Sequence, residues 1–337
     1  MSQFLNASVP KGLDAPAPIA GEIFHPGERA LQAYFNAWKN SAHYGVRAIQ
    51  PLLAPAQATF LGSLRLVAVG ACDPSGDVWA SVLFGECGFV TACDASTLRV
   101  AARLHDDDPL RPALEPNTPV GLLGIDLGRR RRIRVNGYTE STTEHALCLR
   151  VAQAYGNCSQ YIWPREHPDV TPAPGASASA RAFPISLQDP VVRLLIARAD
   201  TFFIASIYEA RPDDPAHIAS GADVSHRGGR PGFLAIEDDV LTWPEYVGNA
   251  YFNTLGNLLV DGRCGLLVPD FESGMVLQVQ GQASIVQAPA TTASAEHQGL
   301  AINCRVRLKV HRAVIRPCLL PRGWPQLGRA ATKDIEL

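Results

Sequence analysis

The chain has 337 residues, of which 47% are hydrophobic and 18% are charged, and its formal net charge is −2. This composition excludes global disorder, the length accommodates two domains, and the near-neutral charge gives no electrostatic case for binding nucleic acid or an anionic membrane. The sequence has no apolar run of about 18 residues and no secretory signal pattern at its N-terminus, so we expect a soluble cytoplasmic protein.

The spacing of cysteine and histidine gives no sign of a metal site or a disulfide framework. Eight cysteines and nine histidines are present, but there is no C-x-x-C and no H-E-x-x-H motif. Such cysteines are typical of reduced, mostly buried small residues. We therefore expect no bound metal ion.

Residues 1–55 are predicted to form an N-terminal arm followed by a helix. Residues 1–23 are rich in proline and alanine and show little periodicity. From Pro26 onward, apolar residues recur at three- and four-residue spacing, which predicts an amphipathic helix of about 13 residues with Glu28 at its positive end. His25 is either a ligand or a capping or packed side chain, and the second role is the commoner one.

Residues 56–165 are predicted to form a first β domain. Short apolar runs between residues 60 and 139 are separated by Asp, Pro and Gly clusters, as in antiparallel strands. Residues 140–156 are expected to form a helix. The clearest strand predictions are Leu64–Val69, Val78–Phe84 and Val120–Ile125.

Two charged clusters lie within this domain. The run Arg129–Arg132 is able to contact nucleic acid or phosphate, but a solvated hairpin tip is the commoner role of such a run. The cluster His105–Asp108 is able to bind a cation, although a solvated acidic loop is again commoner. Both clusters are therefore expected at the surface.

Residues 166–190 are predicted to be a linker, and residues 191–337 a second β domain. The linker is clearest at Thr171–Ala180, where the residues are small, uncharged and partly proline. Val191–Ala199 then predicts a helix, and Thr201–Ile207 predicts the first strand of the second domain.

Near the C-terminus, Cys304–Pro317 alternates apolar with basic residues. A period of two predicts a half-exposed strand. Its basic face is able to approach a cofactor phosphate, although a solvated sheet edge protected by charges is the commoner case.

The two domains resemble each other in sequence. A shift of 144 residues, without gaps, gives 12 identities over positions 81–137, where about 4 are expected by chance. The matches include Ser81 with Ser225, and Gly121-Leu122-Leu123 with Gly265-Leu266-Leu267. The sequence therefore predicts two copies of one barrel.

The candidate binding residues lie in Ala222–Asn257. This stretch has Ser225, Arg227 and Arg230 among glycines, and later three asparagines at four-residue spacing, which we expect on one face of a helical turn. Guanidinium groups beside a backbone that carries few side chains suit a dianionic phosphate, although the same glycine and proline content is typical of an ordinary loop.

The segment Asp200–Ser284 resembles the flavin-binding split-barrel proteins related to pyridoxamine 5′-phosphate oxidase. The motifs that carry the resemblance are Ser225–Phe233, Leu241–Pro244, Gly248–Leu258 and Gly265–Phe271, with Phe24–Glu28 and Gly156–Arg165 upstream. The resemblance implies a mainly β fold, an antiparallel barrel that binds FMN. The oxidase itself has Ser-Arg-Lys where this chain has Val247-Gly-Asn249, and its C-terminal Arg-Leu-x-Pro is missing, so pyridoxamine phosphate oxidation is not carried over.

The residues predicted to bind FMN divide by role. Two arginines neutralise the phosphate, a hydroxyl and two glycine N–H groups donate to it, three asparagines bind ribityl or phosphate oxygens, and two aromatic side chains border the flavin ring or the substrate pocket. In that order they are Arg227 and Arg230; Ser225, Gly228 and Gly229; Asn249, Asn253 and Asn257; Trp243 and Tyr246. No catalytic acid or base is assigned, because hydride transfer through flavin N5 does not require one.

The two copies differ in charge at the aligned positions. Leu83 and Glu86 of the first copy stand where the second has Arg227 and Arg230, and an acid repels a phosphate. Single split barrels of the resembled family usually pair around the cofactor. We therefore expect two tandem antiparallel split β-barrels with flanking helices that form a pseudo-dimer, in which the degenerate copy supplies one wall of a single site, and we allow for a homodimer of whole chains.

Three functions are compatible with these features. The favoured one is an FMN-dependent oxidoreductase that acts on an unidentified small molecule, with NAD(P)H or a similar electron donor. The second is a non-catalytic flavin or haem carrier or sensor. The third is a structural interaction module in which both sites are inactive.

Overall fold

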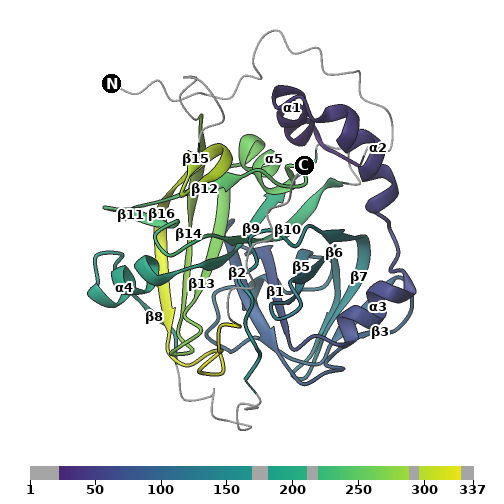
Figure 1. Ribbon diagram of the computed structural model, residues 1–337. Coiled ribbons are helices and arrows are strands. Elements are labelled where there is room, and N and C mark those ends of the chain that lie inside the picture. The colour runs from purple at the N-terminus through teal and green to yellow at the C-terminus, as the bar shows by residue number, and fades with distance from the viewer. Residues whose placement is uncertain (1–22, 169–180, 211–218, 288–295, 328–337) are drawn as a thin grey trace.

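The computed structural model describes residues 23–168, 181–210, 219–287 and 296–327. Within these ranges the chain is mainly β, with two antiparallel sheets side by side and few helices (Figure 1). The predicted fold class, two tandem barrels with flanking helices, is confirmed. The predicted linker Thr171–Ala180 and residues 1–22 of the predicted arm lie outside the described residues.

The first sheet has the strand order β2-β1-β5-β6-β7-β4-β3. Each neighbouring pair is antiparallel. Its strands are β1 (Leu66–Cys72), β2 (Val78–Phe84), β3 (Val90–Ala92), β4 (Thr97–Val100), β5 (Pro119–Asp126), β6 (Arg131–Thr142) and β7 (Leu147–Asn157).

The second sheet has the strand order β10-β9-β13-β14-β16-β12-β11, and β8 and β15 each pair with β16. Its strands are β8 (Phe183–Pro184), β9 (Thr201–Tyr208), β10 (Gly221–Gly228), β11 (Ala235–Glu237), β12 (Val240–Tyr246), β13 (Arg263–Pro269), β14 (Val276–Gln287), β15 (Glu296–His297) and β16 (Leu300–Arg316).

The two sheets are copies of one design. Their strand orders are identical once β1–β7 are matched in turn with β9–β14 and β16. Gly121 lies opposite Asn136 in the first sheet, and Gly265 lies opposite Gln280 in the second, so the register also repeats at a spacing of 144 residues. A register shift follows directly after Asn136 and again after Gln280. The predicted repeat is therefore a repeat of the fold.

Five α-helices and one 3-10 turn flank the sheets in the described part of the chain. They are α1 (Pro26–Tyr34), α2 (Trp38–Ala48), α3 (Pro55–Gly62), α4 (Pro190–Arg198), α5 (Asn253–Val260) and the 3-10 helix η1 (Arg111–Ala113). The single helix predicted from Pro26 is corrected to two, because Asn36 has a φ of 53° and breaks the helical path.

Two other predictions are corrected. Residues 140–156 form the end of β6 and most of β7, because Leu147, Leu149 and Val151 are buried at every second position rather than at helical spacing. The basic segment Cys304–Pro317 belongs to β16, which lies between β14 and β12 and is therefore an interior strand, not an edge.

The two barrels pack face to face through β1, β2 and β5 of the first copy and β9, β10 and β13 of the second. In β1, Val67 and Val69 point into the first barrel's own core, whereas Leu66 and Ala68 join a shared core with Phe203 of β9. Strands buried on both faces read as continuous apolar runs, which explains why these segments do not alternate with polar residues.

Glycine allows the closest approach between the barrels. A Cβ at Gly121 would lie 2.8 Å from the Cα of Asp223, and a Cβ at Gly265 would lie 2.7 Å from the Cα of Trp79. Gly265 lies 144 residues after Gly121, and Asp223 lies 144 residues after Trp79, so each contact is the counterpart of the other. The two copies are therefore related by an approximate two-fold axis, as in a pseudo-dimer.

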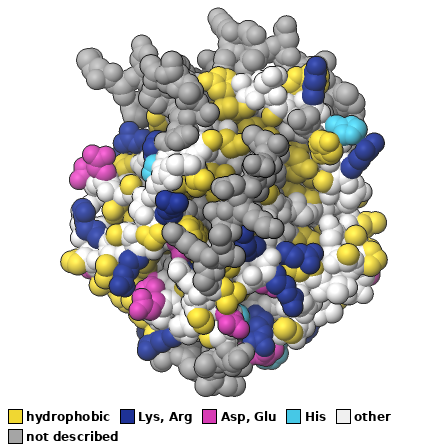
Figure 2. All heavy atoms as spheres, in the orientation of Figure 1, with side chains coloured by type: hydrophobic (Ala, Val, Ile, Leu, Met, Phe, Trp, Pro, Cys, Tyr) yellow, Lys and Arg dark blue, Asp and Glu magenta, His cyan; other side chains and the backbone are white. Residues whose placement is uncertain are grey.

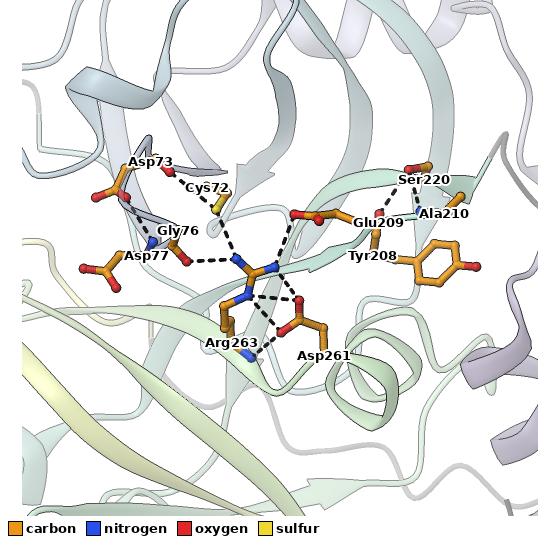
Figure 3. A network of polar contacts seen from close by, with 10 residues as sticks. All are labelled: Cys72, Asp73, Gly76, Asp77, Tyr208, Glu209, Ala210, Ser220, Asp261 and Arg263. Atoms are coloured by element: carbon orange, nitrogen blue, oxygen red, sulfur yellow. Dashed lines mark hydrogen bonds and ion pairs between the residues drawn. The ribbon is translucent and has the colours of Figure 1, made fainter. Parts of the chain in front are cut away.

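A polar cluster around Arg263 joins the barrels at one end (Figure 3). The Arg263 guanidinium pairs with Asp261 and Glu209 of its own copy, and it also donates to the carbonyl oxygen of Gly76, 3.1 Å away in the first copy. On the face shown in Figure 2, basic, acidic and apolar side chains are intermixed. No helix within the described ranges is long and apolar enough to cross a bilayer.

The N-terminal helix α1 packs against α5 of the second copy. A Cβ at Gly27 would lie 2.3 Å from the carbonyl oxygen of Gly256, and a Cβ at Gly256 would lie 2.6 Å from the backbone nitrogen of Glu28. The two helices therefore cross at a pair of glycines. This crossing fixes Glu28 beside the first turn of α5.

The glycine contacts between the barrels give a first prediction. Gly121→Ala and Gly265→Ala are each expected to lower the free energy of unfolding by about 1–3 kcal/mol, because the added methyl group has no room beside the partner backbone. Gly156→Ala is the matched control, since a Cβ there meets nothing within 4 Å. Urea unfolding of the three variants tests this, and equal stability for all of them would contradict the packing described.

Candidate functional site

A cavity of about 110 Å³ lies between the two copies. The first copy contributes β6, the end of β7 and the segment after it, and the second contributes β10, β12 and the N-terminus of α5. The lining residues with polar side chains are Arg132, Arg134, Asn157, Cys158, Gln160 and Tyr161 from the first copy, and Ser225, His226, Arg227, Glu245, Tyr246, Asn249, Asn253, Thr254 and Asn303 from the second. The degenerate copy thus forms one wall of the cavity.

Three arginines meet in this cavity. Arg134 pairs with Asp223, with 2.9 Å between Nε and Oδ1, and Arg227 pairs with Glu245 at 2.8 Å between Nε and Oε1. Among the described side chains, no carboxylate lies within ion-pair distance of Arg132. The cavity therefore holds one more cationic group than it has anionic partners.

Burial is the main cause of an unusual pKa at Arg132. Together with the guanidinium groups of Arg227 and Arg134, it lowers the pKa of Arg132 to about 10. The pKa of His226 is held well below its usual range by burial and by the neighbouring guanidinium groups of Arg132 and Arg227. An anion bound here would relieve this repulsion among the cations.

His226 is fixed as a neutral donor. An arginine only donates, so the 3.0 Å contact between Arg132 Nη1 and His226 Nδ1 makes Nδ1 the acceptor and places the ring proton on Nε2. That Nε2 atom is buried without a hydrogen-bond partner, as are Arg132 Nε and Asn157 Nδ2. Three residues that line the cavity therefore each carry a buried donor without an acceptor.

The N-terminus of α5 also faces the cavity. Phe252 stands at its N-cap position with no capping side chain, so the first-turn N–H groups lack that partner. Thr254 Oγ1 donates to Ser225 Oγ at 2.8 Å, and Arg134 Nη2 donates to the same oxygen. Ser225 accepts both hydrogen bonds and retains its own proton for another acceptor. A helix N-terminus with these donors attracts an anion.

The three predicted asparagines do not share one helical face. Asn249 precedes α5 and donates to Asn157 Oδ1 at the cavity wall, 2.8 Å away. Asn253 begins α5, where its Oδ1 accepts from Arg134 Nη1 at 2.9 Å. Asn257 is buried beyond the cavity and donates to Ser206 Oγ. Positive φ angles at Ala250 and Phe252 turn the chain before the helix begins, so Asn249 is not on the helix. Only Asn249 and Asn253 line the cavity.

The other predicted residues fall into two groups. Ser225, Arg227, Gly228 and Tyr246 line the cavity, and Gly228 is required there because a Cβ would lie 1.9 Å from the carbonyl oxygen of Tyr161. The remaining three do not line it: Gly229 donates its N–H to the Asp200 carbonyl, Arg230 is exposed, and Trp243 is fully buried.

The position of Trp243 corrects its predicted role beside a flavin ring. Its side chain packs in the core of the second barrel, where its Nε1 donates to Glu245 Oε1 at 2.9 Å. The residue holds the carboxylate that pairs with Arg227, so it supports the cavity from behind.

Two tyrosines, one from each copy, stack at the rim of the cavity. The rings of Tyr161 and Tyr246 have centroids 4.9 Å apart and an interplanar angle of 28°. Tyr161 Oη donates to the Val247 carbonyl, and Tyr246 Oη contacts His297 Nδ1 at 3.0 Å. These rings form an aromatic surface at the rim, where Tyr246 lies but Trp243, the other predicted aromatic residue, does not.

A buried polar network extends from the cavity to α1. Asn253 Nδ2 donates to Glu28 Oε1, and the backbone N–H of His25 donates to Glu28 Oε2 at 2.8 Å. His25 caps α1 and stacks on Tyr208, so its predicted capping or packed role is confirmed. Burial raises the pKa of Glu28 to about 8, despite these hydrogen bonds.

Sequence reasoning missed the basic side chains of the first copy. Arg129, Arg130 and Arg131 are exposed, as predicted for a hairpin tip, but Arg132 turns into the cavity and Arg134 is buried there. The usable signal was period two: Arg132 and Arg134 alternate with Ile133 and Val135 of the core, so they share the opposite face of β6. Among the described residues, no group of three or more His, Cys, Asp or Glu side chains is placed to bind a metal ion.

Comparison with known proteins gives neighbours in structure only. No family model matches the chain, and no curated protein matches it in sequence. Similar solved structures include HupZ of Group A Streptococcus, at 12% identity, a TM-score of 0.26 and coverage of 42% of this chain and 98% of that one.

Two further structures are similar over comparable lengths. A FAD-binding protein of Mesorhizobium loti has 10% identity, covers 41% of this chain and 98% of that chain, and has a TM-score of 0.26. An F420 reductase has 17% identity, covers 40% of this chain and 96% of that chain, and has a TM-score of 0.23.

The raised pKa of Glu28 predicts a pH-dependent stability. An ordinary carboxyl titrates near 4.5 and the folded group near 8, so the folded protein takes up a proton. Burial of Glu28 therefore does not destabilise the fold through its charge below about pH 4.5. As the pH rises from there toward about 8, it lowers the free energy of unfolding by at most about 5 kcal/mol. In Glu28→Gln this fall should be absent. Urea unfolding from pH 5 to 9 measures it, and identical pH profiles for variant and wild type would contradict a buried, titrating Glu28.

Proposed function

We propose that the cavity between the two copies binds FMN and that the protein is an FMN-dependent oxidoreductase acting on a small molecule. The observation that carries the proposal is the uncompensated guanidinium of Arg132, which lines the same cavity as Arg134 and Arg227. Buried charge of one sign is costly unless a partner of the other sign is present. A phosphate monoester is such a partner.

The donors of the cavity suit a phosphate in number and kind. Guanidinium groups pair with phosphate oxygens bidentately, and the N-terminus of α5 adds backbone N–H groups and the positive end of the helix dipole. Ser225 contributes a hydroxyl proton. Arg134 and Arg227 are each paired with a carboxylate, so Arg132 from the first copy carries more of the uncompensated charge than the sequence implied.

The size of the cavity determines where the ring of a bound flavin would lie. Cavities that enclose a drug-sized ligand measure about 300–1,000 Å³. The 110 Å³ here fits the phosphate and the adjacent hydroxyl-bearing chain. Tyr161 and Tyr246, at the rim, are the residues that would border the ring of a bound flavin.

FMN, when bound, supplies the redox chemistry, and the chain's residues hold and orient it. Arg132, Arg134 and the first turn of α5 bind the phosphate. Asn157 and Asn249 offer amide groups to the hydroxyls, since Asn157 Nδ2 has no partner among the described atoms. A reduced nicotinamide such as NADPH or NADH is the proposed electron donor, and its nicotinamide would reach the ring from the open rim.

The role of Arg132 predicts a loss of phosphate recognition in its variant. Arg132→Met should weaken FMN binding about 10- to 100-fold, because one charge-assisted interaction is lost. Riboflavin lacks the phosphate, so its weaker binding should change little. Fluorescence titration of both ligands measures the preference, which should be large in the wild type and much reduced in the variant.

Arg129→Met is the matched control, since Arg129 lies in the same hairpin but is exposed. It removes the same charge from the chain and should leave the preference for FMN unchanged. The assignment fails if both variants bind FMN as the wild type does, or if riboflavin and FMN bind the wild type equally well.

Catalysis is tested separately from binding. The FMN-loaded protein, mixed with NADPH or NADH without oxygen, should lose the flavin absorbance within seconds to minutes and recover it when oxygen or an electron acceptor is added. A protein that binds FMN but is not reduced by either nicotinamide would instead be a flavin carrier or sensor. A Soret band in place of flavin absorbance would indicate haem.

A further inference from the structure

The two-fold relation between the copies places a second, equivalent position on the other side of the molecule. The cavity brings Ser225 and the first turn of α5 against Arg134 of the other copy. At the spacing of 144 residues the counterparts are Ser81, the turn that precedes η1, and Gln278 of β14. The register of β5 with β6 and of β13 with β14 matches Arg134 to Gln278.

This second position is filled by the side chain of Asp108. Ser81 Oγ donates to Asp108 Oδ2 at 2.6 Å, the backbone N–H of Leu110 donates to Oδ1 at 2.9 Å, and Gln278 Nε2 lies 3.4 Å from Oδ1. All four residues are buried. The carboxylate is thus enclosed by a hydroxyl, a backbone N–H and a side chain of the other copy.

These donors correspond one by one to groups of the cavity. Ser81 corresponds to Ser225, the N–H of Leu110 to that of Thr254, and Gln278 to Arg134. In the cavity no carboxylate takes the equivalent place, because the counterpart of Asp108 is a phenylalanine, Phe252. Its φ is 60°, and its ring stacks on Phe35.

The position around Asp108 also differs from the cavity in its cationic side chains. Val276 stands where the cavity has Arg132, and Leu83 stands where it has Arg227. The cation near Asp108 is instead Arg316, which is 1% exposed and whose Nη2 lies 2.6 Å from Asp107 Oδ1. Burial raises the pKa of Asp108, whereas its three donors and Arg316 act in the opposite direction.

We propose that Ser81 and the Leu110 N–H of the first copy, together with Gln278 of the second, form a carboxylate-binding site, and that Asp108 occupies it as an internal ligand. The site is thereby closed to an external anion. Together with the proposed function, on which this part rests, the arrangement limits the chain to one flavin.

Removal of the internal ligand tests the proposal. Asp108→Gly leaves a buried space with the size and donors of a carboxylate carried on a methyl group, which is the shape of acetate. The full-length variant should melt below the wild type and should regain most of that loss, saturably, in millimolar acetate. Formate should restore less, and butyrate, which is too long, should restore nothing.

Three controls keep the result specific. Sodium chloride at the same ionic strength should not reproduce the acetate effect. Asp106→Gly makes the same change two residues away at an exposed side chain and should not respond to acetate. Asp108→Asn keeps the space filled, so it should be destabilised and not rescued. If Asp108→Gly does not fold in buffer, its refolding yield should rise with acetate and not with chloride.

The outcomes separate this proposal from the one on function. An Asp108→Gly protein that responds equally to acetate and chloride, or to neither, overturns the internal ligand. Two FMN molecules per wild-type chain would also overturn it while supporting the function. A wild type that binds no flavin would end the proposed function, and the acetate experiment would still decide the question of Asp108.

Discussion

Close packing of the two barrels through β1, β2 and β5 of one copy and β9, β10 and β13 of the other is the constraint on which the rest of the molecule depends. It requires glycine at positions 121 and 265, where the backbone of the partner copy fills the space of a side chain. It also sets the polar face of β6 against β10 and α5, which brings Arg132 and Arg134 to Ser225. Neither copy contains the cavity alone, because β10 and α5 of the second copy face the arginines of β6 in the first.

Burial decides the chemistry of the cavity. The same guanidinium groups at a solvated surface would be screened and contribute little. Between the barrels, burial and the guanidinium groups of Arg227 and Arg134 lower the pKa of Arg132, burial with Arg132 and Arg227 keeps His226 neutral, and several buried donors have no acceptor. The opposite solution appears at the equivalent position between the copies, where the chain supplies the carboxylate of Asp108 and where Val276 and Leu83 replace two of the three arginines.

The sequence predicted the fold better than the site. Apolar runs and the 144-residue repeat were sufficient for the two-barrel architecture, since both reflect strand pairing that each copy forms locally. The helix predicted over residues 140–156 was wrong because alternation in β7 is diluted by small residues. Arg132 was assigned to a solvated tip, and Trp243 to a ligand, because pairing between copies determines which faces are buried. That information lies in no single segment.

Carrying both walls of the cavity on one polypeptide has a consequence for assembly. A site shared by two separate subunits disappears when they dissociate on dilution, whereas a covalent tandem holds its halves at a high effective concentration whatever the protein concentration. The join also removes the symmetry requirement that both subunits carry the same sequence. Each copy was then free to specialise, one toward helix α5 and its donors and the other toward the arginines of β6.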